Sequence, residues 1–515
     1  MTSIATSRCR LTAVIVVEDA SADLRASMFS VAPAADETIV LNVSGHPLKA
    51  SVPPGVTSLE RDPDDPAAAK NDALAAAQGD WILFLNAGES LAAEAAQSMC
   101  AWLCTQPTLD AAYWCWLDLP PATPDLHGEQ VAVMRLFPKC GGLRFSGIVR
   151  ETALPAIEAL QVRVELSDWR IAAPSTGQDA AAVETSARQL MRLATMDVQQ
   201  VGMNPRALVA SAEAHATLGD RTRATQHYYQ ALRLADRGSL DMLIAYYGLL
   251  GLFRGDESDR RQQLAVCLEA LETFPYDAQL LCAMGAYLQQ QDHLELACRS
   301  FQAAFEIGQV EPRAIHLRDL PAIGAVNWSL LLQIRGEHER ALRVLDQACQ
   351  RFPQVSSLAR RKLELLVQLG RDSEALAATS NVAQDGSGVE AMRIGVRGAC
   401  LAAQGNWIPA LGYLRTAYEA GCHDPICLRW LTIGLLALGQ ADAARPVLQD
   451  WRAAAPSDVE AARYQEELDK SVASPAIRGR QKARSVRVDS AQPAPEALIK
   501  LPGAPAGATA AQPGV

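Results

Sequence analysis

The first third of the chain alternates short apolar runs with stretches of helical spacing. Strands are expected where apolar or β-branched residues are consecutive, at 11–17, 36–41, 82–85, 111–117, 131–137 and 162–171. Helices are expected where apolar residues recur every three or four positions, at 22–31, 67–77 and 92–103. Repeated strand–helix–strand units are typical of a parallel sheet with right-handed crossovers and helices on both faces.

The run Ile82–Leu85 contains four consecutive apolar residues, so we expect a strand buried on both faces of the sheet. It leads directly into a small polar turn, Asn86-Ala87-Gly88-Glu89. In open α/β sheets, ligands bind beyond the carboxyl ends of the strands. The turn is therefore a candidate binding site, although an ordinary turn after a buried strand has the same pattern.

Beyond Gly202 the strand pattern stops and helical spacing continues with a period. The repeats align on one position, which is small in all but one of them: Ala224, Gln263, Ala297, Ala341, Ala375, Ala410 and Ala444. Four of the six spacings are 34 or 35 residues, the period of tetratricopeptide repeats, in which helix pairs stack into a superhelix. The resemblance extends over residues 205–458.

Other positions support this register. Glycines recur where the two helices of a repeat meet, at Gly219, Gly336, Gly370, Gly405 and Gly439. The 44-residue spacing from Ala297 to Ala341 indicates an insertion near residues 310–320. The first helix of each repeat is expected to line a concave groove that binds a peptide or protein. Groove candidates are Glu213, Tyr246, Arg360 and Arg397.

Composition narrows the possible functions. The chain has 515 residues and a net charge of −11, which argues against a general nucleic-acid-binding surface. No apolar run is long enough for a membrane span, and the amino terminus does not match a signal peptide, so a cytoplasmic location is expected. The 12 cysteines are scattered without a CxxC pair, which predicts reduced thiols rather than a zinc site.

These patterns predict an α/β domain followed by an all-α repeat array. The α/β domain is assigned to residues 10–175 and a helical connector to 176–204. The repeats follow at 205–458, and residues 470–515 are rich in proline and alanine, with six basic residues against two acidic ones from 471 onward. This composition predicts a disordered basic tail.

Within the α/β domain, four segments occur in the order found in bacterial family-2-type glycosyltransferases of the GT-A fold, which the domain resembles. They are Asp36–Gly45, Lys70–Leu74, Gly79–Glu89 and Arg135–Glu151. The resemblance covers residues 10–175. It implies an inverting enzyme that transfers a sugar from a nucleotide-sugar donor to an acceptor, here a protein bound by the repeats.

The resemblance also implies roles for individual residues. The donor would be lined by Glu18, Asp19, Asn42, Lys70, Asn86 and Arg150. A divalent metal, Mn²⁺ or Mg²⁺, would be held by Asn86 and Glu89, because a cation neutralises the charge that develops on the departing diphosphate. Glu151 would be the catalytic base on the acceptor hydroxyl.

The sequence differs from the family pattern at three places. Asn86 and Gly88 stand where the family usually has aspartates, Asn42 stands where it usually has another, and Arg150 replaces a common histidine. Three functions are compatible with this combination: a metal-dependent transferase, a degenerate transferase fold that acts with the repeats as a protein-binding scaffold, and a metal-independent transferase. In the last, Arg150 or Lys70 would take the place of the cation.

Overall fold

The computed structural model describes residues 8–19, 22–48, 52–105, 107–120, 128–174, 180–253, 257–382, 388–456 and 458–473. The chain forms two compact units. One contains the described residues up to Asp277 together with Val310–Arg318, and the other contains Ala278–Gln309 and the described residues from Asp319 onward. Most of the predicted basic tail, residues 474–515, lies outside the described residues.

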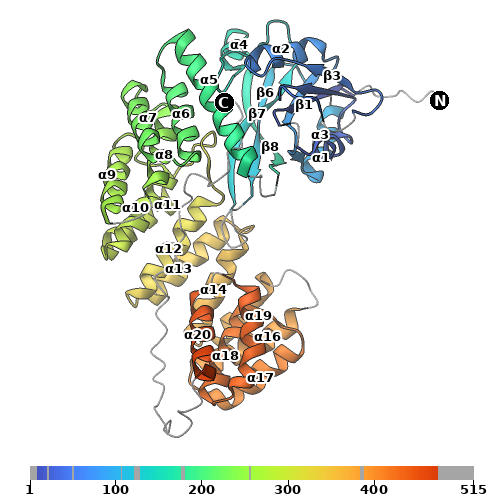
Figure 1. The fold of residues 1–515 in the computed structure, drawn as a ribbon. Helices are drawn as coiled ribbons and strands as arrows, with labels where there is room; N and C mark the ends of the chain where they lie inside the picture. Colours follow the sequence, from blue (N-terminus) through green and yellow to red (C-terminus); the bar gives the residue numbers. More distant parts are fainter. Residues whose placement is uncertain are drawn as a thin grey trace, which may run out of the picture. The chain divides into compact units, whose positions relative to one another are not determined.

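The first unit contains a mixed β-sheet (Figure 1). Its strands are β1 (Leu11–Val17), β2 (Glu37–Asn42), β3 (Thr57–Glu60), β4 (Trp81–Asn86), β5 (Ser90–Leu91), β6 (Ala111–Leu119), β7 (Glu129–Pro138), β8 (Arg163–Ala172) and β9 (His316–Leu317). The order is β3-β2-β1-β4-β7-β6-β8-β5, and β9 pairs with β7. The expected strands are therefore present. The sequence did not predict β3, β5 or β9.

The prediction of a parallel sheet is correct for only part of it. Strands β3, β2, β1 and β4 are parallel, whereas β7 runs antiparallel to both β4 and β6. The reason lies in the connections. A helix joins the parallel neighbours β1 and β2, but β6 and β7 follow one another with no helix between them among the described residues, as in a hairpin.

Helices cover both faces of the sheet. They are α1 (Leu24–Val31), α2 (Pro66–Ala76), α3 (Ala93–Cys104) and α4 (Leu154–Ala159). Every residue of β1 is buried, and alternate residues enter different cores: Leu11 and Ala13 pack with α3, whereas Val14 and Val16 pack with α2. This confirms the expectation of a sheet buried on both sides. The helix α2 begins at Pro66, one residue before the predicted start at 67, because the Asp65 side chain caps it and Pro66 occupies its first turn.

The helix α5 (Ala180–Val201) follows the sheet and packs on α6 (Pro205–Thr217) through a small apolar cluster. Within the same unit, α6 pairs with α7 (Arg221–Leu234), and α8 (Leu240–Leu252) pairs with α9 (Glu257–Thr273). The cluster includes Val149 from the loop after β7, so the connector helix contacts both the sheet domain and the first repeat.

The second unit consists of further helix pairs and a final helix. They are α10 (Ala278–Gln290) with α11 (Leu294–Glu306), α12 (Leu320–Ile334) with α13 (His338–Arg351), α14 (Ser356–Gln368) with α15 (Asp372–Ala378), α16 (Val389–Ala403) with α17 (Trp407–Glu419), α18 (Pro425–Ala437) with α19 (Ala441–Ala454), and α20 (Val459–Ala473). The short 3₁₀ turn η1 (Thr379–Asn381) follows α15.

The predicted repeat register agrees with the helices. All seven aligned positions fall on the second helix of a pair, and the six alanines among them are fully buried. The exception, Gln263, is also buried, and its amide donates to the carbonyl of Phe253 at the end of α8. The five turn glycines all have positive φ, between 65° and 82°, a conformation that favours glycine. The predicted insertion contains β9.

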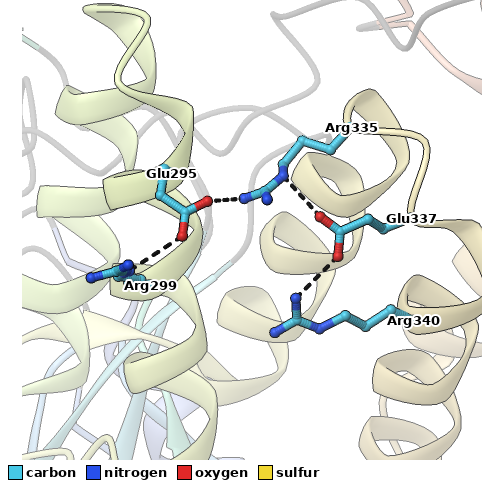
Figure 2. A network of polar contacts seen from close by, with 5 residues as sticks. All are labelled: Glu295, Arg299, Arg335, Glu337 and Arg340. Carbon is cyan, nitrogen blue, oxygen red and sulfur yellow. Dashed lines mark hydrogen bonds and ion pairs between the residues drawn. The ribbon is translucent and has the colours of Figure 1, made fainter.

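Exposed ion pairs connect neighbouring repeats in the second unit. Figure 2 shows Arg335, at the end of α12, paired with both Glu295 of α11 and Glu337. Arg299 and Arg340 extend the network at 3.3 Å and 3.0 Å. Because these groups are largely solvated, we assign the network to the outer surface and not to a binding site. Among the described residues, no helix combines the length and apolar character needed to cross a membrane.

Candidate functional site

Several of the predicted donor-side residues lie at one edge of the sheet. Strand β1 pairs in parallel with β2 and β4, with Val17 opposite Asn42 and Val16 opposite Asn86. The carboxyl ends of these three strands therefore meet, and Glu18 follows β1 directly. This is the edge at which open α/β sheets bind ligands.

Glu89 is buried and held by two partners. Its Oε1 lies 2.6 Å from Nη2 of Arg135, which comes from β7, and its Oε2 accepts a hydrogen bond of 2.8 Å from the backbone N–H of Asn86. Arg135 is only 2% exposed. The carboxylate that was expected to hold a metal is thus neutralised by a cation of the same domain. Sequence reasoning assigned no role to Arg135, although a lone arginine inside an apolar strand indicates a buried partner.

The turn between Asn86 and Glu89 depends on glycine. Gly88 has a φ of 92°, and its N–H donates to the Ser27 hydroxyl at 2.9 Å. A side chain on Gly88 would face Pro174 at about 3.4 Å. The glycine that stands in place of the family's aspartate is therefore required by this backbone conformation.

Glu151, the predicted base, forms a second buried pair. Its Oε1 contacts the ammonium group of Lys70, which α2 supplies, and both residues are less than 10% exposed. The Lys70 ammonium also lies 5.4 Å from the ring centre of Phe145. Lys70 and Glu151, which were assigned to the donor and to the catalytic base, are thus paired with each other and neutralise each other.

The carboxyl group of Glu18 lies within the electrostatic influence of both pairs. Its pKa is raised, first because surrounding protein displaces water from the carboxyl group. Lys70 opposes this increase and Glu151 adds to it. Much of the residue is nevertheless exposed, as is Asp19, which follows it. Glu18 is therefore an exposed residue whose carboxyl group interacts with both buried pairs.

Asn42 is occupied by its own turn. Its Nδ2 donates to the carbonyl of His46 at 2.8 Å, and its Oδ1 accepts from the N–H and the hydroxyl of Ser44 at 3.1 and 2.7 Å. Such a turn is a common use of asparagine. Asn86 keeps a more open amide, whose Oδ1 is 3.5 Å from Arg135.

Arg150 is positioned by a left-handed backbone, with φ of 51°, and its side chain is directed to the first repeat. Its Nη2 lies 2.5 Å from Oε2 of Glu213 on α6. Burial alone would lower the pKa of Arg150, but Glu213 and Asp241 more than offset that effect, so the pKa is raised. A pocket of about 130 Å³ adjoins this pair, lined by Arg150, Leu154, Arg206, Leu240, Asp241, Ile244 and Arg313.

The predicted groove residues on the repeats are mostly engaged as well. Glu213 pairs with Arg150, Tyr246 is buried and donates to Glu269, and Arg360 pairs with Asp424 at 2.8 Å. Arg397 on α16 is exposed. Among the described residues, no group of three histidine, cysteine or acidic side chains is arranged to hold a metal ion.

The comparisons with known proteins give matches among solved structures. No protein-family model matches the chain, and no curated protein matches its sequence. Among solved structures, the chain is similar to a tetratricopeptide repeat protein from Parabacteroides merdae, with 15% identity over 50% of this chain and 94% of that one, at a TM-score of 0.30. It is also similar to yeast Tom70, with 13% identity over 58% of this chain and 62% of that one, at a TM-score of 0.32.

A third similar structure is YrrB, described as a TPR protein with an unusual peptide-binding site, with 16% identity over 46% of this chain and 96% of that one, at a TM-score of 0.24. At these identities and scores the likeness identifies no partner and no activity. The repeat architecture rests on the helix pairs of the chain itself, with their 34-residue period, buried alanines and turn glycines.

Proposed function

We propose that this chain is a protein-binding scaffold. In this proposal the helix pairs bind a peptide or protein partner, and the α/β domain is a degenerate transferase fold that supports them. The observation that carries the proposal is the internal pairing of Glu89 with Arg135 and of Glu151 with Lys70. The two carboxylates that the chemistry would need are both buried and neutralised.

The energetics of these pairs favour a structural role. A metal ion that recruited Glu89 would have to displace Arg135 and leave a buried guanidinium without a counter-charge. Separating a buried ion pair in this way costs about 3–5 kcal/mol. Glu151 faces a similar cost, because a base that accepts a proton would leave the Lys70 ammonium buried beside a neutral group.

The repeat array supports the binding role. Successive first helices contact one another, α10 with α12, α12 with α14, α14 with α16 and α16 with α18. They form a continuous layer in the second unit, and such layers present the extended surfaces on which repeat proteins bind their partners. The buried alanines and turn glycines explain how the helices approach closely enough to stack.

Two measurements on the full chain test this proposal. In the first, a random peptide library displayed on phage is selected against the immobilised protein, and enriched peptides are cross-linked to locate their site. We expect enrichment of peptides that cross-link to first helices of the repeats. In the second, uridine diphosphate is titrated by calorimetry with and without Mn²⁺. We expect no heat of binding in either case.

A transferase is the second candidate, favoured by one observation: Glu18, Lys70, Asn86, Glu89 and Glu151 all lie at the same sheet edge. In this alternative a nucleotide-sugar donor would bind there with Mn²⁺ or Mg²⁺, or with Lys70 replacing the cation. Metal-dependent binding of uridine diphosphate, together with donor hydrolysis in the presence of Mn²⁺, would establish the transferase and reject the scaffold proposal for the α/β domain.

A further inference from the structure

The first helices of the last three repeats carry an excess of positive charge. The helix α14 has Arg360, Arg361 and Lys362 against Glu364. The helix α16 has Arg393 and Arg397 against Glu390, and α18 adds Arg429. The chain as a whole has a net charge of −11, so this local excess opposes the overall balance.

Most of these cations already have acidic partners within the unit. Arg361 pairs with Glu364 at 2.8 Å, Lys362 with Asp346 at 2.6 Å and Arg429 with Glu460 at 2.7 Å. Arg360 is likewise paired with Asp424. These four side chains are therefore accounted for by the fold.

Arg393 and Arg397 are different. Both are exposed, and neither forms an ion pair with any residue that the structure describes. They are four positions apart on α16, so both project from one face of the helix, about one turn apart. The opposite face is closed: at Gly395 and Gly398 the helix packs tightly against Cys427 and Leu414.

The second arginine is also pre-oriented. The guanidinium of Arg397 lies 5.3 Å from the ring centre of Tyr413 on α17, and this tyrosine is 36% exposed. This cation–π contact restricts the position of the guanidinium, and no hydrogen bond or ion pair to a described residue is found for its N–H groups. A guanidinium so placed is suited to bind a carboxylate with two parallel hydrogen bonds.

We propose that Arg393, Arg397 and Tyr413 form a binding site for an acidic peptide segment of a partner protein. The proposal rests on the scaffold function and specifies that the partner segment is acidic. The distance between the arginines determines the expected motif, because four residues of an α-helix advance about 6 Å and two residues of an extended chain span about 6.7 Å. Two acidic residues separated by one position, in an extended segment, fit the two arginines.

A nucleic acid fits this surface less well. Binding to a phosphate backbone requires many cations along a continuous track. Here only two cations are unpaired among the described first-helix residues of these three repeats, and Glu390 lies one turn from Arg393. A short acidic motif therefore matches the surface better than a polyanion.

The test uses the full chain and the same phage-display selection. Enriched peptides should carry two acidic residues separated by one position. A fluorescein-labelled octapeptide with two glutamates at this spacing is then titrated by fluorescence anisotropy, alongside the same peptide with glutamines. We expect Arg393→Glu/Arg397→Glu to weaken binding of the acidic peptide at least tenfold and Arg393→Lys/Arg397→Lys to weaken it less, because lysine keeps the charge but loses the bidentate geometry.

The matched control is Arg343→Glu/Arg452→Glu. These arginines are also exposed, lie on second helices and form no ion pair with a described residue. The control changes the net charge by the same amount and should leave binding unchanged. Circular dichroism and thermal unfolding of both double variants establish that they remain folded.

The remaining outcomes separate this inference from the scaffold function. Enrichment of peptides without acidic pairs, or equal losses in the test and control variants, would overturn the inference and leave the scaffold function standing. Tighter binding of a twelve-residue oligothymidylate than of the peptide would also overturn it, in favour of a general polyanion surface. A selection that enriches no peptide would contradict both.

Discussion

Arg150 and Glu151 are neighbours in the chain, yet their side chains form buried ion pairs with different parts of the first unit. Glu151 contacts Lys70 of α2, whereas Arg150 contacts Glu213 of α6 in the first repeat. The positive φ of Arg150 turns the backbone between the two directions. One loop thus joins the candidate site and the repeats.

This relationship predicts a large effect of Glu213→Gln. The substitution removes the ion-pair partner of the buried Arg150 guanidinium and leaves only the electrostatic influence of Asp241, so the cost should be up to about 3–5 kcal/mol. Hydrogen exchange measured by mass spectrometry should show lost protection in α6 and in residues 146–152.

The control for Glu213→Gln is Glu165→Gln, which breaks the solvent-exposed pair with Arg163 and should change protection little. The double variant Arg150→Met/Glu213→Leu, in which both charges are removed, should recover much of the protection. Equal effects of Glu213→Gln and Glu165→Gln would mean that Arg150 is solvated in solution.

A single added carboxylate should not create a metal site at Asn86 and Glu89. In Asn86→Asp the new carboxylate would face Arg135 and stand beside Glu89, which Arg135 already holds at 2.6 Å. We expect no Mn²⁺ binding to this variant by calorimetry at millimolar metal. Binding of Mn²⁺ with a stoichiometry near one would show that the metal ion displaces Arg135 from Glu89, and would strengthen the transferase alternative.

A companion variant tests the turn itself. Because Gly88 has a φ of 92°, Gly88→Ala should destabilise the sheet edge by about 1–2 kcal/mol. Gly141→Ala is the control, since a Cβ added to Gly141 would meet no atom within 4 Å and Gly141 has no positive φ. Hydrogen exchange in β4 and residues 86–91 should increase only for Gly88→Ala.

Ionisation of Glu18 should make the stability of the folded protein depend on pH. Its folded-state pKa is raised above the unfolded value, so the folded protein binds the proton more tightly. Stability contributed by this group is therefore highest at pH values below the unfolded pKa of about 4.3, and it declines as the pH rises through the folded pKa.

Glu18→Gln removes this ionisation and should be more stable than the parent chain at pH 7. The difference should disappear near pH 4. Thermal unfolding of both proteins between pH 4 and 8 measures it. A difference that does not vary with pH would indicate that Glu18 ionises normally.

Much of this architecture is encoded in local patterns. The strand at 82–85 and the helix start, predicted at 67 and found at Pro66, depend on adjacent residues, so they can be recognised in the sequence to within a residue or so. The repeat register is visible for the same reason, because a buried alanine and a turn glycine recur at fixed spacing in most of the repeats.

The pairing of the site residues is not visible in this way. Glu89 meets Arg135 and Arg150 meets Glu213 across 46 and 63 positions, and only the tertiary fold determines these partners. Likewise, Glu213 and Arg360 have the expected polar character for a groove, but nearby opposite charges engage them. Residue type predicted where charged side chains would lie, whereas the tertiary fold determined which of them form ion pairs with other described residues.

The packing of the repeats provides the last prediction, at two adjacent alanines of α19. Ala444 is fully buried at the aligned repeat position, whereas Ala443 is exposed. Ala444→Leu forces a larger side chain between closely packed helices and should destabilise α18 and α19 by about 1–3 kcal/mol. Ala443→Leu should change stability by no more than about 0.5 kcal/mol. Hydrogen exchange in 425–454 measures both, and similar exchange in the two variants would contradict the repeat register, because the register places only Ala444 between the helices.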